Sequence, residues 1–154
     1  MADLKLSFLG FLIINSFFLN LTGIFTSNWV IGSSWNQGLV LNGDNVNFFA
    51  AIFMFVTLAV SVILVILYSF IYFQTRDGDY PDGLRKWFRI NTLFSVVNVT
   101  LTSIAIILVR PDAYTDANRS GYYTLGFSAW LCLISSVMAT AIAATSVYIA
   151  SEEF

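Results

Sequence analysis

The sequence contains no histidine and only one cysteine, Cys132. These absences exclude an internal disulfide, a zinc site built from His and Cys, and catalysis by a histidine general base. We therefore expect no enzymatic activity and no bound cofactor. The chain also has no run of basic residues that would bind a phosphate backbone, so nucleic acid is not an expected partner.

Charged residues are scarce, at 10% of 154 residues, whereas hydrophobic residues make up 58%. A soluble domain usually carries about 25% charged residues. A chain this short exposes too much of its surface to hide such an apolar excess inside one globule. Lipid must therefore be the solvent for most of the chain.

Four apolar runs are long enough to cross a bilayer, which requires about 20 apolar residues in helical conformation. The uninterrupted part of each run contains no Lys, Arg, Asp or Glu. The first run is longer than the apolar core of a signal peptide, which spans about 7–15 residues. We predict a single domain over residues 1–154, an all-α, left-handed four-helix transmembrane bundle, with helices at about residues 6–25, 48–73, 87–109 and 125–150.

Basic residues are distributed unevenly between the two sides of this bundle. One side carries Lys5, Arg76, Arg85, Lys86 and Arg89, whereas the other has Arg110 and Arg119. The positive-inside rule then predicts a multi-pass protein with both termini in the cytoplasm, which we expect in the plasma membrane. The triplet that begins at Asn118 falls in an outer connection and is a candidate glycosylation site.

Small and polar residues predict which helix faces meet inside the bundle. In lipid, helices associate through close packing of small residues and through interhelical hydrogen bonds. An unpaired amide in hydrocarbon is costly, so the intramembrane asparagines should face the bundle and bond one another. The small-residue rows of the last helix are Ser135, Ala139 and Ala143, and beside them Ser136, Thr140 and Ala144; the intramembrane asparagines are Asn15, Asn20, Asn91 and Asn98.

The second predicted helix consists almost entirely of large side chains and has no small or polar stripe. We therefore expect it to face lipid or a partner protein. The predicted lateral partner face consists of Phe53, Leu58, Val62 and Ile66.

The connection after the first helix contains two short β-prone stretches, Trp29 to Ile31 and Leu39 to Leu41, separated by a polar turn region. This pattern predicts a β-hairpin. An isolated hairpin is marginal in water. We expect Trp29 and Trp35 to hold it against the outer helix ends.

This loop resembles that of the claudin group of tetraspans, which includes claudins, peripheral myelin protein and its relatives, and the stargazin-like receptor regulators. Trp29 matches the lone tryptophan that follows the first helix in this group. The stretch after Trp35, namely Gly38, Leu39, Val40, Leu41 and Asn42, is similar to the Gly-Leu-Trp motif, with Val40 at the second tryptophan and Gly43 at the first cysteine. The four-helix order, the cytoplasmic termini and the longer first loop are also similar.

The chain departs from the group in two ways. Both extracellular cysteines are missing, and the loop from Thr26 to Asn47 is too short for the usual strands and extracellular helix. The resemblance implies that the first pair of strands remains and the disulfide-closed pair is absent. In claudins that region supplies the charged wall of a paracellular pore and the contacts between cells, whereas here the loop holds a single charge, Asp44. We therefore expect lateral association rather than a charge-selective pore.

Three functions are compatible with the sequence. The first is an accessory or structural subunit that binds laterally, within the lipid bilayer, to another integral membrane protein or to itself. The second is a cell–cell junction, adhesion or barrier protein acting through residues 29–45 and 112–123. The third is a small channel or transporter using Asn15, Asn91 and Asn98. The acidic-aromatic tail resembles ligands of PDZ and CAP-Gly domains, but only about four residues clear the last helix, so we expect no such reader.

Overall fold

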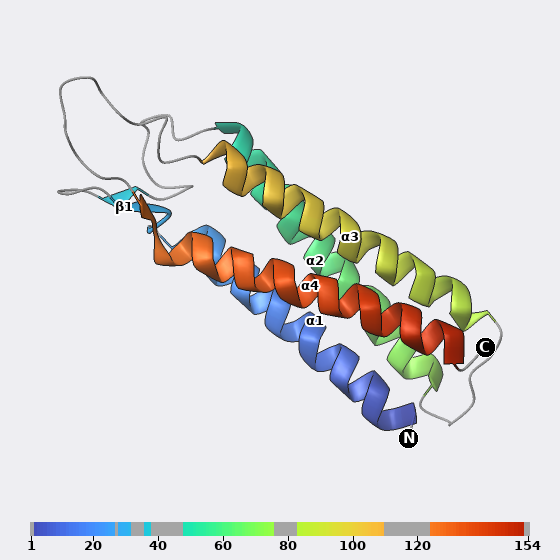
Figure 1. Cartoon of the computed structure of the whole chain (residues 1–154). Helices are drawn as coiled ribbons and strands as arrows, with labels where there is room; N and C mark the ends of the chain where they lie inside the picture. Colours follow the sequence, from blue (N-terminus) through green and yellow to red (C-terminus); the bar gives the residue numbers. More distant parts are fainter. Residues whose placement is uncertain are drawn as a thin grey trace, which may run out of the picture.

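A computed structural model describes residues 2–26, 28–31, 36–37, 48–75, 83–109 and 124–152. Within these ranges the chain forms four long helices and three two-residue strands (Figure 1). The helices are α1 (Ala2–Phe25), α2 (Phe48–Thr75), α3 (Leu84–Leu108) and α4 (Phe127–Glu152), and the strands are β1 (Val30–Ile31), β2 (Asn36–Gln37) and β3 (Thr124–Leu125). All four helices are long and apolar enough to span a membrane. The prediction of a four-helix transmembrane protein is confirmed.

The helix ends differ from the predicted ones by a few residues. α1 begins at Ala2, α3 begins at Leu84, α2 continues to Thr75, and α4 begins at Phe127. The apolar runs mark only the part of each helix that lies in hydrocarbon, whereas a helix continues into the headgroup layer with charged residues such as Lys5. The fourth helix starts later than predicted because residues 124 and 125 form a strand.

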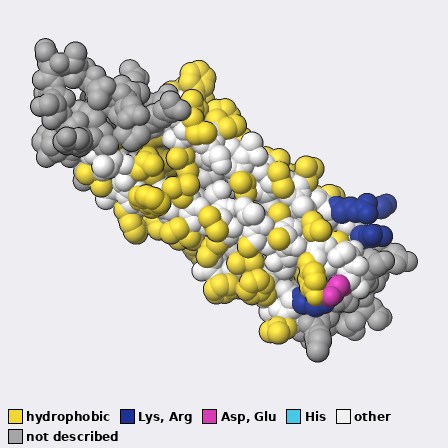
Figure 2. Space-filling model, in the orientation of Figure 1, with side chains coloured by type: hydrophobic (Ala, Val, Ile, Leu, Met, Phe, Trp, Pro, Cys, Tyr) yellow, Lys and Arg dark blue, Asp and Glu magenta, His cyan; other side chains and the backbone are white. Residues whose placement is uncertain are grey.

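Each helix packs against two others, in the ring order α1, α2, α3, α4 and back to α1. The three strands lie at one end of the elongated bundle, which we call the sheet end (Figure 1). Both termini lie at the opposite end, which we call the terminal end. The Lys and Arg side chains among the described residues gather at the terminal end, as Figure 2 shows.

The bundle interior consists of two apolar clusters with a polar layer between them. The cluster toward the terminal end includes Leu9, Ile13, Leu64, Phe88 and Ile142. The cluster toward the sheet end includes Ile24, Trp29, Met54, Val109 and Cys132. The central polar layer consists of Ser16, Asn20, Thr57, Ser61, Asn98 and Ser135, each at most 3% exposed.

Ser61 is the shared acceptor of this layer. The Nδ2 atoms of Asn20 in α1 and Asn98 in α3 donate to Ser61 Oγ at 3.1 and 2.8 Å, and the hydroxyl donates to the Thr57 carbonyl at 3.0 Å. One hydroxyl thus uses its proton and both lone pairs, and it connects three helices. Ser16 and Ser135, with Oγ atoms 2.8 Å apart, connect α1 to α4.

The expectation that the second helix lacks a polar stripe is wrong. Ala50, Thr57 and Ser61 are buried in α2, and their spacing of seven and four residues places them on one helix face. Large residues on either side obscure this stripe in the sequence. The predicted partner face is also divided, because Phe53 and Leu58 pack against the sheet-end cluster, whereas Val62 and Ile66 are 41% and 62% exposed.

Replacing Ser61 by alanine removes the acceptor of two buried amides. An unsatisfied buried donor costs about 1–3 kcal/mol, although interhelical hydrogen bonds inside membranes average only about 0.6 kcal/mol. We expect Ser61→Ala to lower the free energy of unfolding by about 1–3 kcal/mol in total. The measurement is unfolding of the detergent-solubilised protein by dodecyl sulfate, followed by far-UV circular dichroism.

The matched control is Ser69→Ala in the same helix. The Ser69 hydroxyl donates to the Val65 carbonyl of its own helix, so its loss breaks no interhelical bond. We expect a change within about 0.5 kcal/mol, as for ordinary surface substitutions. Equal losses in the two variants would contradict the connecting role of Ser61.

Candidate functional site

The first candidate feature is the indole of Trp29 at the sheet end. Its side chain is fully buried, and its Nε1 donates to the Gly23 carbonyl at 2.7 Å. The last carbonyls of a helix have no intrahelical donor, so this indole caps α1. The cap determines the direction in which the chain leaves α1.

Ser128 in the first turn of α4 connects this segment to the opposite helix. Its Oγ lies 2.6 Å from Thr26 Oγ1 and accepts a hydrogen bond from the Asn28 amide at 3.2 Å. The Ser128 amide in turn donates to the Asn28 carbonyl at 3.1 Å. The end of α1 and the start of α4 are thus joined through backbone and side chain.

Gly126 allows these two segments to approach closely. Its amide donates to the Trp29 carbonyl at 2.8 Å, and a Cβ at this position would stand 2.0 Å from the Asn28 carbonyl oxygen. Any other residue would therefore displace the backbone. We call Thr26, Asn28, Trp29, Gly126 and Ser128 the sheet-end clamp.

The clamp carries a three-stranded antiparallel sheet in the order β2-β1-β3. The predicted hairpin is confirmed as the pair β1 and β2, in which Val30 lies opposite Gln37. Its second strand is residues 36–37 rather than 39–41, and β3 was not predicted. Strands this short are specified by backbone pairing and by the clamp, so alternating side chains do not reveal them.

The small-residue rows of α4 are only partly interior. Ser135, Ser136 and Ala139 are buried and Ala143 is half-buried, whereas Thr140 and Ala144 are exposed. The second row, Ser136, Thr140 and Ala144, is thus wrong as an interior row. Four residues turn a helix by about 400°, so such a row shifts by about 40° at each step and leaves the interface.

The interior row of α4 extends further toward the sheet end than predicted, to Cys132 and Ser128. Cys132 is buried against Gly23 of α1, where a Cβ on the glycine would stand 2.5 Å from the Cys132 Sγ. The cysteine therefore packs as a small side chain at a close helix contact.

Three of the four predicted asparagines are fully buried. They bond to serines rather than to one another, because Asn20 and Asn98 share Ser61, and Asn91 donates to Ser146 at 2.8 Å. The three amide oxygens have no hydrogen-bond partner among the described residues. The fourth, Asn15, is half-buried and donates to the Phe11 carbonyl of its own helix at 2.7 Å, so it does not join the interior set.

Several predicted site residues lie outside the part of the chain that the structure describes. These are Trp35, Gly38, Leu39, Val40, Asn42 and Asn118. The described site also contains residues that the sequence pattern does not single out: Ser61, Gly126, Ser128 and Ser146. Continuing the four-residue spacing back from Ser136 through Cys132 leads to Ser128, but no local pattern indicates its contact with Asn28.

The second candidate feature is the lateral surface of the bundle. Among the described residues, every exposed large hydrophobic side chain except Ile31 belongs to a helix. Figure 2 shows these side chains along the length of one face. A cavity of about 360 Å³ opens on this lateral surface between α1 and α4, and we call it the α1/α4 groove; it is lined by Lys5, Phe8, Ala144, Thr145 and Tyr148.

The whole chain, residues 1–154, matches the family model described as "Tight junction protein, Claudin-like". No curated protein matches the chain. The family match covers all four helices and the sheet-end clamp.

We predict that Trp29→Phe isolates the contribution of the indole hydrogen bond. Phenylalanine retains an aromatic ring but has no donor for the Gly23 carbonyl, so the free energy of unfolding should fall by about 0.5–1.5 kcal/mol from the lost bond alone. The matched control is Trp130→Phe in the first turn of α4, where the side chain is 55% exposed. Dodecyl sulfate unfolding of both variants measures the difference, and an equal effect of the two substitutions would argue against the cap.

Proposed function

Because the chain belongs to the claudin-like family of tight junction proteins, we propose that it is a non-enzymatic structural protein that associates laterally with copies of itself in the membrane. The observation that carries this proposal is the position of the exposed apolar surface. Apart from Ile31, the exposed large hydrophobic side chains of the described residues lie on the helices. Such a surface meets partners within the bilayer.

Two parts of the lateral surface differ in shape, because one protrudes and the other is hollow. Val62, Ile66 and Phe73 share one face of α2, are exposed and protrude as large side chains; we call them the α2 ridge. The α1/α4 groove is hollow, and beside it the exposed Thr140 and Ala144 allow close approach of another helix. A ridge of one copy would fit the groove of the next.

The ridge and the groove lie at comparable distances from the terminal end. Ile66 lies nine residues before Thr75, the last residue of α2, and Ala144 lies eight residues before Glu152, the last described residue of α4. Copies inserted in the same orientation would therefore bring them to similar depth. Contact between two different surfaces is heterologous, and it extends into rows of molecules unless the rotation closes a ring.

Lateral rows agree with a structural role at cell junctions, in line with the family's description. We place the terminal end in the cytoplasm and the protein in the plasma membrane. This orientation is supported by Lys5, Arg85, Lys86 and Arg89, which lie at that end. A larger membrane protein in place of a second copy, as expected of an accessory subunit, would use the same groove.

Cysteine cross-linking tests the heterologous contact. In a Cys132→Ala background, chains carrying Ile66→Cys are mixed in one membrane with differently tagged chains carrying Ala144→Cys. We expect a cross-linked dimer that contains both tags, at about ten times the yield from either variant alone, because neither surface faces itself. Gel electrophoresis with detection of both tags is the measurement.

Leu93→Cys provides the matched control for Ile66→Cys. Leu93 is 62% exposed, the same as Ile66, and lies nine residues from Leu84, the terminal-end residue of α3. Its mixture with Ala144→Cys should give only background cross-linking. Equal yields from the Ile66 and Leu93 mixtures would contradict a specific contact, and self-cross-linking of Ile66→Cys alone would replace it with a symmetric dimer.

A further inference from the structure

A second cavity opens at the terminal end, between the start of α3 and the last turns of α4. It has a volume of about 260 Å³. Arg85, Arg89 and Thr92 line it from α3, and Val147, Ala150 and Ser151 line it from α4. The two arginines are four residues apart, so both guanidinium groups lie on one face of α3.

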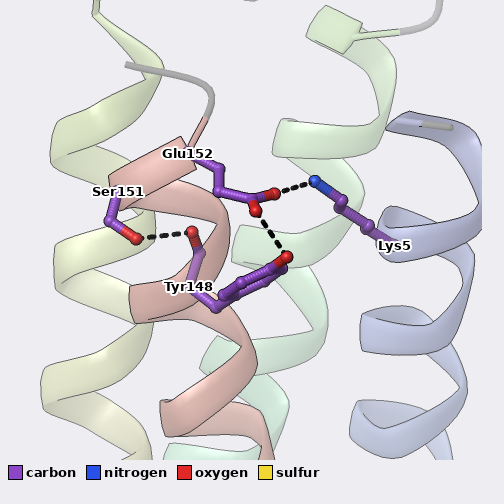
Figure 3. A network of polar contacts seen from close by, with 4 residues as sticks. All are labelled: Lys5, Tyr148, Ser151 and Glu152. Atoms are coloured by element: carbon purple, nitrogen blue, oxygen red, sulfur yellow. Dashed lines mark hydrogen bonds and ion pairs between the residues drawn. The ribbon is translucent and has the colours of Figure 1, made fainter.

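The described residues that line this cavity include two positive charges and no acidic side chain. Neither arginine forms an ion pair with a described residue. Glu152, the acidic residue nearest the cavity whose side chain is described, is turned toward Lys5 of α1 and also accepts a hydrogen bond from the Tyr148 hydroxyl, as Figure 3 shows. The carboxylate is thus engaged on the opposite flank of α4.

The start of α3 adds positive charge to this cavity. The first turn of α3 contains no acidic residue, and Gly83, which precedes it, provides no side-chain cap. The positive end of the helix dipole therefore coincides with Arg85 and Arg89, where an acidic group would be the favourable neighbour. An external anion at this place would satisfy both the guanidinium groups and the exposed amides of the helix end.

The position relative to the bilayer indicates the class of anion. α3 has 25 residues, which correspond to about 37 Å of helix, about 7 Å more than the hydrocarbon core. With the excess at this end of the helix, Arg85 lies in the headgroup layer and Arg89 lies at its boundary with the hydrocarbon. Beyond them on the same side of α3 lie Leu93 and Val96, which are 62% and 51% exposed and offer an apolar surface to acyl chains.

We propose that this cavity binds the phosphate of an anionic phospholipid, with the guanidinium groups of Arg85 and Arg89 as donors and the acyl chains along Leu93 and Val96. Arginine suits this ligand because its planar fork forms paired hydrogen bonds with phosphate oxygens. Basic pockets between transmembrane helices are typical places for such headgroups. The site is separate from the α1/α4 groove and the α2 ridge.

The test measures binding of individual lipids to the detergent-purified full-length protein by native mass spectrometry, with phosphatidylserine and phosphatidylcholine as probes. We expect phosphatidylserine to bind about tenfold more tightly than phosphatidylcholine, because its headgroup has a net negative charge and a carboxylate beside the phosphate, whereas the choline ammonium offsets the charge of the phosphate in phosphatidylcholine. Arg85→Gln and Arg89→Gln should each weaken phosphatidylserine binding about tenfold and weaken the binding of zwitterionic phosphatidylcholine by a smaller factor.

The matched control is Lys86→Gln, which removes one positive charge from the same turn but does not line the cavity. We expect it to change phosphatidylserine binding by less than about twofold. Arg89→Lys, which retains the charge without the planar fork, should give an intermediate loss and separates hydrogen-bond geometry from charge.

Three results would overturn the proposal. The first is equal weakening of phosphatidylserine binding by Lys86→Gln and Arg89→Gln, which would show that only the net charge matters. The second is equal binding of phosphatidylserine and phosphatidylcholine. The third is displacement of phosphatidylserine by inorganic phosphate at equal concentration, which would assign the cavity to a soluble anion.

Discussion

The architecture depends on a constraint that lipid imposes: the hydrophobic effect does not press transmembrane helices together. Polar contacts and close packing must hold the bundle instead. Ser61 meets this requirement with one hydroxyl, because it accepts from asparagines in α1 and α3 while its proton is bound within α2. The serine pair Ser16 and Ser135 connects the remaining helix. The two apolar clusters pack on either side of this layer, so its register sets which side chains meet in each cluster.

The short strands at the sheet end are held against the helix ends without a disulfide. The one cysteine is buried at the contact between α1 and α4, and a single cysteine cannot form a disulfide within the chain. The sheet-end clamp takes this role through the Trp29 indole, the Ser128 hydroxyl and the close approach at Gly126. The missing cysteines of the family pattern therefore coincide with a sheet whose strands are only two residues long and are held by neighbouring helices.

Much of the fold could be predicted from the sequence because a bilayer demands a simple length of apolar helix, and four runs meet it. The interior face of α2 could not be predicted. Ala50, Thr57 and Ser61 stand among large residues, and they form a stripe only when the structure shows which face of α2 is buried. The candidate site was only partly predictable. Trp29 stood out as a residue type, whereas Gly126 and Ser128 act through backbone atoms more than 90 residues away in the chain, and such pairing leaves no local pattern.

Because of the ring order, different faces of the lateral surface are available to different partners. α2 and α4 are not neighbours in the ring, so the α2 ridge and the α1/α4 groove face different directions, and under the proposed contact one molecule would meet two others at once. A protein with a single self-complementary face would stop at a dimer, whereas two complementary faces permit a row. The face between α3 and α4 carries the arginine cavity, and the exposed Leu93 and Val96 lie on α3 beyond it. A phospholipid on that face would fill the space that neither protein contact covers, so lipid and protein partners need not compete for the same surface.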